Sequence, residues 1–270
     1  MTEVASASIG VFDSGVGGLT VLRALHRRMP DAPLLYLGDS SHAPYGLRPP
    51  AQIIERCERI VRHLVDQGAG LIVVACNTAT ACAIDHLRDI WPGLPFVGIE
   101  PGIKPAVLQS HNHRIAVMAT PATIASARLR RLIELHAQGT SVHLQACPEL
   151  ASAIEHGVLS GPVLRQMLQP WCAQIAEFGA DTVVLGCTHY AFVAQTIDSL
   201  LGPGIALVDT AQAVAQQVAS RRAELCLAAA AVTPAPPPRL MSTGDPSTMQ
   251  RLAQRSFGIG MAAVDVVCLE

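Results

Sequence analysis

Apolar runs of strand length alternate with helix-length segments along the whole sequence. The runs are continuous, as in SIGVF (residues 8–12), LIVVAC (71–76) and DTVVLGC (181–187). A strand that is apolar at successive positions is buried on both faces, which is typical of parallel sheets covered by helices. Similar runs are PLLYLG, LPFVGI, RIAVMA, SVHLQA and IALVD. Because helix-length segments separate these runs, the pattern predicts an α/β protein with mostly parallel sheets joined by right-handed crossovers.

Two of these runs end alike, and the repetition predicts two similar halves. LIVVACNTATA (71–81) carries Cys76, and DTVVLGCTHYA (181–191) carries Cys187. We expect two three-layer parallel-sheet domains with the active site between them. The first domain would comprise residues 1–98 and 209–270, and the second residues 99–208.

In open parallel sheets, ligands bind beyond the carboxyl ends of the strands. Four segments stand at such places: VFDSGVGGLT, LGDSSHAPYG, VACNTAT and VLGCTHY. The glycines of the first leave bare N–H groups at a strand-to-helix turn, which suits a carboxylate or small phosphate. The dinucleotide fingerprint would need glycine where the chain has Thr20, so NAD binding there is disfavoured. Asp13 and Ser14 either cap the following helix or act in the cleft.

Cys76 and Cys187 are the candidate reactive groups. A thiol between a strand end and the first turn of a helix has its pKa lowered from about 8.5 by N–H groups and the helix dipole. Polar neighbours follow both cysteines, namely Asn77, Thr78, Thr188 and His189. A single thiol with a histidine would suit acyl transfer. Two equivalent thiols instead suit racemisation, in which a base on one face and an acid on the other exchange roles.

Composition and motifs narrow the function classes. The 19 basic and 21 acidic residues give a net charge of −2, so neither nucleic acid nor an anionic membrane is an expected partner. The sequence starts without a signal-peptide pattern and contains no apolar stretch of about 18 residues. We therefore expect a cytoplasmic protein whose eight cysteines stay reduced.

Metal and cofactor signals are missing from the sequence. It has no Cys-x-x-Cys or His-Glu-x-x-His spacing, so no metal site is expected. Pyridoxal phosphate requires a Schiff-base lysine, and the one lysine, Lys104, is expected in a turn between the halves. We therefore expect no cofactor.

The four strand-end segments, with TPATIAS near Thr120 and MSTGDP near Gly244, resemble the glutamate racemases of the aspartate/glutamate racemase family. The resemblance runs from about Ser8 to Gly258, and the order and spacing of the motifs make it specific. It implies a cofactor-independent isomerase that interconverts L- and D-glutamate. It also implies a homodimer that supplies D-glutamate for peptidoglycan synthesis, and so for cell-wall biogenesis and cell shape.

The resemblance also implies roles for individual residues. Cys76 and Cys187 match the catalytic pair, each of which takes the α-proton of one enantiomer. Asp13 matches an acid near the first thiol, whereas His189 and Glu155 match groups that assist the second. Positions that match substrate-binding residues are Asp13, Ser14, Tyr45, Gly46, Asn77, Thr78, Thr120, Thr188 and His189, with Thr123 as a further hydroxyl.

The segment before Glu155 departs from the family pattern. Relatives typically read Cys-Pro-Leu-Val-Pro there, whereas this chain reads CPELAS over residues 147–152. The added acid and the lost proline change the local sequence that sets the register of Glu155.

Three other functions fit parts of the pattern. A racemase for aspartate or a hydantoin would share the thiol pair, whereas a thiol hydrolase or amidotransferase would tolerate the loss of Cys76. A non-catalytic amino-acid sensor would bind its ligand without exchanging the α-proton. The polar residues that flank both thiols favour a racemase.

Overall fold

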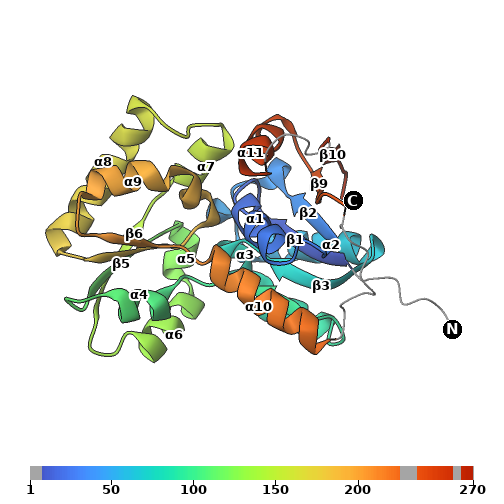
Figure 1. The fold of residues 1–270 in the computed structure, drawn as a ribbon, viewed down its shortest axis with the longest axis horizontal. Coiled ribbons are helices and arrows are strands. Elements are labelled where there is room, and N and C mark those ends of the chain that lie inside the picture. Colours follow the sequence, from blue (N-terminus) through green and yellow to red (C-terminus); the bar gives the residue numbers. More distant parts are fainter. Residues whose placement is uncertain (1–7, 226–235, 258–262, 270) are drawn as a thin grey trace. The chain divides into compact units, whose positions relative to one another are not determined.

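The computed structural model describes residues 8–225, 236–257 and 263–269. They fall into two compact units, which divide between Ile99 and Glu100 and again between Thr210 and Ala211. Each unit has a parallel sheet flanked by helices (Figure 1). The predicted α/β class and the parallel sheets are confirmed.

The sheet of the first unit has the strand order β10-β9-β2-β1-β3-β4, and all its pairings are parallel. Its strands are β1 (Ser8–Asp13), β2 (Leu34–Gly38), β3 (Ala69–Val74), β4 (Phe96–Gly98), β9 (Arg239–Ser242) and β10 (Asp265–Val266). The first four coincide with predicted apolar runs. Because β1 lies between β2 and β3, Asp13 pairs with Gly38, and the neighbouring Phe12 pairs with Val74. The ends of three strands therefore meet at one edge.

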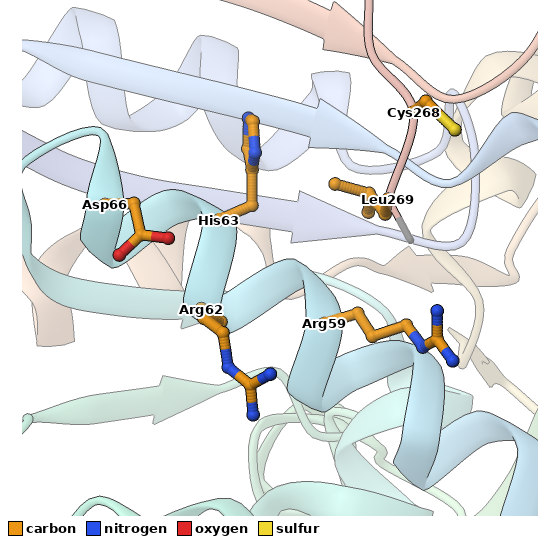
Figure 2. A pocket seen from close by; sticks show the side chains of 6 residues that line it. All are labelled: Arg59, Arg62, His63, Asp66, Cys268 and Leu269. Carbon is orange, nitrogen blue, oxygen red and sulfur yellow. The ribbon is translucent and has the colours of Figure 1, made fainter.

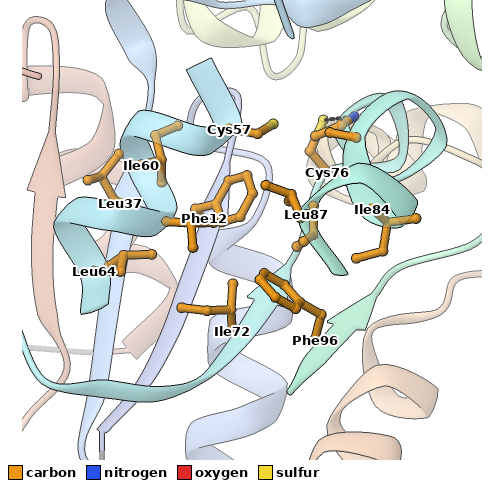
Figure 3. Close-up of a cluster of buried hydrophobic side chains, with 14 of the residues drawn as sticks. Phe12, Leu37, Cys57, Ile60, Leu64, Ile72, Cys76, Ile84, Leu87 and Phe96 are labelled. Carbon is orange, nitrogen blue, oxygen red and sulfur yellow. Dashed lines mark hydrogen bonds between the residues drawn. The ribbon is translucent and has the colours of Figure 1, made fainter. Parts of the chain in front are cut away.

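Helices cover both faces of this sheet. They are α1 (Leu19–Arg28), α2 (Pro50–Asp66), α3 (Asn77–Ile90), α10 (Ala211–Glu224) and α11 (Ser247–Phe257), with the 3₁₀ turns η1 (Ser40–His42) and η2 (Tyr45–Leu47). Helix α1 packs against α10 and α11, whereas α2 packs against α3. Figure 3 shows the apolar cluster between the sheet and helices α2 and α3. In it, Phe12 and Ile72 of the sheet face Ile60 of α2 and Leu87 of α3. This core holds the strand ends in place.

The second unit has the strand order β6-β5-β7-β8, again with every pairing parallel. Its strands are β5 (Arg114–Ala119), β6 (Ser141–Ala146), β7 (Thr182–Leu185) and β8 (Ala206–Val208). Its helices are α4 (Ile103–Gln109), α5 (Pro121–Ala125), α6 (Ala127–His136), α7 (Leu150–Glu155), α8 (Pro162–Phe178), α9 (Ala194–Leu201) and the 3₁₀ helix η3 (Thr188–Val193). Within this unit, α4 and α6 lie on one side of the sheet and α8 and α9 on the other (Figure 1).

The turn predicted around Lys104 is wrong, because these residues begin helix α4. Gly102 precedes the helix, and Pro105 lies in its first turn, where the missing N–H of proline removes no helical hydrogen bond. The side chain of Lys104 is exposed.

Among the described residues, no helix is long and apolar enough to cross a membrane.

Candidate active site

In both units, predicted site residues lie at or just beyond the carboxyl ends of strands, whereas Glu155 lies at the end of helix α7. In the first unit Asp13 ends β1, and Cys76 follows β3. In the second unit Thr120 follows β5, and Cys187 follows β7. Within each sheet the parallel strands bring these ends to one edge, where α/β proteins bind ligands.

Cys76 is the N-cap residue of α3. Its Sγ accepts a hydrogen bond of 3.4 Å from the backbone N–H of Ala79, marked by the dashed line in Figure 3. The residue is 6% exposed. The start of a helix carries partial positive charge, which favours a thiolate over a neutral thiol. The predicted helix N-terminus at this sulfur is therefore confirmed.

A carboxylate reaches the Cys76 thiol through one hydroxyl. Ser14 Oγ lies 3.7 Å from Cys76 Sγ and 3.4 Å from Oδ1 of the fully buried Asp13. The backbone N–H of Gly15 also donates to this Oδ1, at 2.8 Å. The N-cap residue of α1 is Gly18, and no side chain caps that helix. The helix-cap interpretation of Asp13 and Ser14 is therefore wrong.

The glycine-rich turn leaves room for this arrangement. A Cβ atom on Gly18 would lie 2.7 Å from the Cβ of Asp13 and 2.9 Å from the hydroxyl of Tyr36. That hydroxyl donates to the carbonyl of Gly15 at 2.7 Å. Any side chain at position 18 would displace Asp13 or break this bond.

The Cys187 thiol has a different set of partners. Its Sγ lies 3.7 Å from Nδ1 of His189, and Nε2 of that ring lies 2.5 Å from Oε1 of Glu155. Burial lowers the pKa of His189, but the contacts with Cys187 and Glu155 outweigh it and hold this pKa well above its usual value. The imidazole is therefore a charged group between a thiol and a carboxylate.

Glu155 meets His189 despite the altered segment before it. Glu149, the added acid, is exposed and takes a left-handed backbone conformation, with φ 61°, directly before α7. Helix α7 then buries Leu150 and Ile154 and ends at Glu155. The changed sequence therefore alters the turn before α7 and leaves Glu155 at the end of that helix.

The prediction that an α-helix begins at each sulfur is wrong for Cys187. It is followed by the 3₁₀ helix η3, which has no side-chain cap bond. The two sulfurs therefore differ in their surroundings, with a helix N-terminus and a hydroxyl at one and a histidine at the other. Sequence similarity between the two segments concealed this difference.

The polar residues that follow the cysteines are buried. Asn77 is 5% exposed, and its Oδ1 has no hydrogen-bond partner among the described residues. An unsatisfied buried acceptor costs roughly 1–3 kcal/mol, so this oxygen is suited to a donor supplied by a ligand. Thr78 and Thr188 are also buried.

Thr120 has a structural role that the sequence did not reveal. Its Oγ1 accepts the N–H of Thr123 at 3.3 Å and lies 3.1 Å from the Thr123 hydroxyl. It is the N-cap residue of α5. Both hydroxyls lie at the carboxyl edge of the second sheet.

The side chain of Tyr45 binds another residue of the protein. Its hydroxyl donates to Oδ2 of Asp39 at 2.7 Å, and the residue is fully buried. A substrate contact here would come from the backbone of Tyr45 and Gly46. The sequence analysis missed Asp39, although this acid directly follows a buried strand just as Asp13 ends one.

A shallow pocket lies along α2, apart from the predicted site residues. It is lined by Arg59, Arg62, His63, Asp66, Cys268 and Leu269. Figure 2 shows that Arg62 and His63 point in different directions from the helix, so the two side chains do not converge on one ligand. In the described part of the chain, no group of three His, Cys, Asp or Glu residues could hold a metal ion.

Comparison with known proteins shows the family of the chain. The model of the Asp/Glu/hydantoin racemase family matches residues 19–218. A glutamate racemase of Pseudomonas aeruginosa is 45% identical over 258 residues, which cover 94% of this chain and 96% of that protein.

Solved structures are similar over almost the whole chain. A glutamate racemase of Francisella tularensis in complex with D-glutamate has a TM-score of 0.86 and 27% identity, covering 98% of both chains. A glutamate racemase of Thermus thermophilus in complex with beta-chloro-D-alanine has a TM-score of 0.80 and 34% identity, also covering 98% of both chains.

Proposed function

The chain belongs to the Asp/Glu/hydantoin racemase family, and from this membership we propose that it is a glutamate racemase that uses two thiols and no pyridoxal phosphate. One observation carries the proposal. Each unit holds a buried cysteine at a strand end, with a proton-handling side chain within 3.7 Å of its sulfur.

Racemisation needs a base and an acid on opposite faces of one carbon. Cys76 takes the α-proton of one enantiomer while Cys187 gives a proton to the other face, and in the reverse reaction the roles exchange. One sulfur is ionised and the other protonated at any time, so the pair titrates as a coupled unit. Two similar groups meet this demand, whereas an acyl-transfer site needs one nucleophile and one base.

The α-proton is hard to remove because the neighbouring carboxylate is already negative. The enediolate-like charge that develops needs preorganised donors. The buried hydroxyls of Thr78 and Thr188 can supply them, as can backbone N–H groups of the Ser14 turn and of Gly46. The unpaired Oδ1 of Asn77 is an acceptor suited to the substrate ammonium group.

The two thiols receive help from different groups. Asp13 acts on Cys76 through Ser14, whereas His189, supported by Glu155, acts on Cys187. Lys104, the one lysine in the sequence, is exposed on α4. The residues present therefore fit proton transfer by thiols and do not fit a Schiff-base cofactor.

Glutamate is proposed as the substrate because the relatives above are described as glutamate racemases, one of them in complex with D-glutamate. The same proposal includes a homodimer in the cytoplasm that supplies D-glutamate for peptidoglycan synthesis, cell-wall biogenesis and cell shape. These last points rest on the resemblance between the sequences.

The test is to incubate the purified protein separately with L-glutamate, D-glutamate, L-aspartate and a hydantoin and to follow optical activity by circular dichroism. The proposal predicts that both glutamate enantiomers decay to zero signal at the fastest rates. Ammonia release from glutamine without such decay would indicate an amidotransferase. Binding of glutamate without decay would indicate a sensor.

A further inference from the structure

Asp39 is a buried carboxylate that joins separate segments of the first unit. Its Oδ2 accepts the Tyr45 hydroxyl at 2.7 Å and Nε of Arg56 at 3.0 Å. Its Oδ1 accepts Nη2 of Arg56 at 2.9 Å and the hydroxyl of Thr243 at 2.7 Å. His42 Nδ1 lies 3.1 Å from the same Oδ1. Asp39 is 0% exposed, and the Arg56 side chain is 12% exposed.

Stability alone is a weak reason for this arrangement. Removing two charges from water costs several kcal/mol each, and buried ion pairs are often no better than apolar packing of the same volume. A buried polar network in which every donor and acceptor has a hydrogen-bond partner is rigid. The network around Asp39 therefore fixes the positions of the groups that it joins.

One of these groups, Tyr45, is connected by packing to the helix that Cys76 caps. Tyr45 belongs to the same buried cluster as Cys76, and η2 contacts α3, the helix that Cys76 caps. The backbone N–H of Asp39 also donates to the carbonyl of Asp13 at 3.0 Å. Asp39 thus connects the turn that carries Tyr45 with the strand end that carries Asp13.

Two segments near the C-terminal part of the sequence also bind this network. Thr243, directly after β9, donates its backbone N–H to the carbonyl of Gly38 at 3.1 Å. Nη1 of Arg56 lies 3.4 Å from the carbonyl of Leu269. The segments around Thr243 and Leu269, which are far from Asp39 in the sequence, therefore fix the positions of the side chains that bind Asp39.

We infer that Asp39 is a positioning residue for proton transfer at Cys76. By holding the Tyr45 hydroxyl against Arg56, it makes the tyrosine ring a fixed wall beside the sulfur. The sulfur then keeps its alignment with the substrate carbon, although Asp39 touches neither group. This inference rests on the proposed function, because it requires Cys76 to move the α-proton.

The second unit offers a matched comparison. Tyr190 is also fully buried in one cluster with the reactive thiol, Cys187, but its hydroxyl donates to the backbone carbonyl of Cys147 at 3.2 Å. Tyr45→Phe and Tyr190→Phe therefore remove the same atom beside different thiols.

The test uses a single diastereomer of 3-chloroglutamate, because each of the two enantiomers of that diastereomer reports on one thiol. A thiolate removes the α-proton, chloride leaves with the electrons of the carbon–chlorine bond, and water converts the resulting enamine to 2-oxoglutarate and ammonia. The Cys76→Ser variant identifies the enantiomer whose elimination depends on Cys76. Ammonia release is then measured for Asp39→Asn, Tyr45→Phe, Tyr190→Phe and Asp31→Asn, with the folded fraction of each taken from thermal unfolding.

Asp31→Asn is the control for loss of an ion pair. Asp31 binds the buried Arg222 at 2.9 Å in the loop before β2, at the opposite end of that strand from Asp39. It should lower the unfolding temperature and leave both eliminations unchanged.

We expect Tyr45→Phe and Asp39→Asn to slow elimination from the Cys76-dependent enantiomer by about tenfold or more, with the other enantiomer nearly unaffected. Tyr45→Phe keeps the test valid if Asp39→Asn does not fold. Tyr190→Phe should spare the Cys76-dependent enantiomer. Equal losses for both enantiomers, or losses that only follow the folded fraction, would overturn the inference. If the unaltered protein neither racemises glutamate nor eliminates chloride, the proposed function fails and this inference fails with it.

Discussion

Nε2 of His189 lies 2.5 Å from Oε1 of Glu155, although the two residues are 34 positions apart in the chain. Burial lowers the pKa of His189, but Cys187 and Glu155 raise it well above its usual value of about 6.5. A raised folded-state pKa stabilises the protein fully below about 6.5, and this contribution is lost as the pH rises through the folded pKa. The imidazolium beside Cys187 thus persists at neutral pH.

Glu155→Gln should lower the pKa of His189, because it removes the negative charge that holds the proton. If activity needs the imidazolium, the alkaline limb of the profile of kcat against pH moves to lower pH. The pKa itself is read from the chemical shift of the His189 ring proton during an NMR titration. Glu149→Gln, the same change at an exposed site on the preceding turn, should leave both curves in place. A Glu155→Gln profile that matches the unaltered protein would contradict this role.

Ser14→Ala should weaken the path between Asp13 and Cys76. The hydroxyl lies 3.4 Å from the carboxylate and 3.7 Å from the sulfur, so its loss removes this hydroxyl bridge between the two groups. We expect kcat to fall about tenfold, less than the roughly 100-fold effect of a residue that transfers the proton itself. Ser199→Ala on the exposed surface of α9 is the control. Full activity in Ser14→Ala would rule out a hydroxyl-mediated path.

Cys76→Ser and Cys187→Ser should each abolish racemisation, because each lacks one of the two proton carriers. Enantiomers have equal free energy, so kcat/KM must be the same in both directions for any active variant. A one-sided defect is therefore visible in a half-reaction. Each serine variant should still release ammonia from one enantiomer of 3-chloroglutamate, and the two variants should select opposite enantiomers. Selection of the same enantiomer by both would contradict the pairing.

Asp181→Asn should alter acid stability without altering activity. Burial raises the pKa of the Asp181 carboxyl, but hydrogen bonds outweigh it and lower this pKa to about 2. They include the N–H groups of His111, at 2.7 Å, and Asn112, at 2.8 Å. The carboxylate therefore stabilises the fold above about pH 4, and the effect is lost as the pH falls toward 2. Asp181 precedes β7, at the end of the sheet opposite Cys187.

Thermal unfolding checks this prediction. The variant should unfold at a lower temperature than the unaltered protein at pH 7, and the difference should shrink between about pH 4 and pH 2. A difference that is independent of pH would show that the side chain acts through packing rather than charge.

The sequence predicted the elements whose pattern is local. Apolar runs marked all eight strands from β1 to β8. The central strands β1, β5 and β7 are almost wholly buried, as parallel strands covered on both faces are, whereas β6 is exposed or half-buried at most positions. Strands β9 and β10 were not predicted, since the first begins with Arg239 and the second has two residues, Asp265 and Val266. They are strands because the edge of an existing sheet provides their hydrogen bonds.

At the site too, the sequence predicted features with a local pattern and missed those that depend on distant residues. Asp13, Cys76 and Cys187 were visible because each lies at the end of a buried strand. The network of Asp39 was not visible, because Arg56 reads as an ordinary charged position on a helix and Thr243 is 204 residues from Asp39. The contrast between the two sulfurs also needed coordinates, since whether an N–H caps the thiol depends on backbone geometry after the strand.

The most direct test of the two-thiol mechanism is deuterium incorporation during the conversion of L-glutamate in heavy water. Early in the reaction, the D-glutamate that forms should carry deuterium at the α-carbon, because one thiol removes the proton and the opposite thiol delivers a deuteron from solvent. The remaining L-glutamate should still carry hydrogen. Deuterium appearing equally in both enantiomers from the start would indicate a single base and would contradict the account.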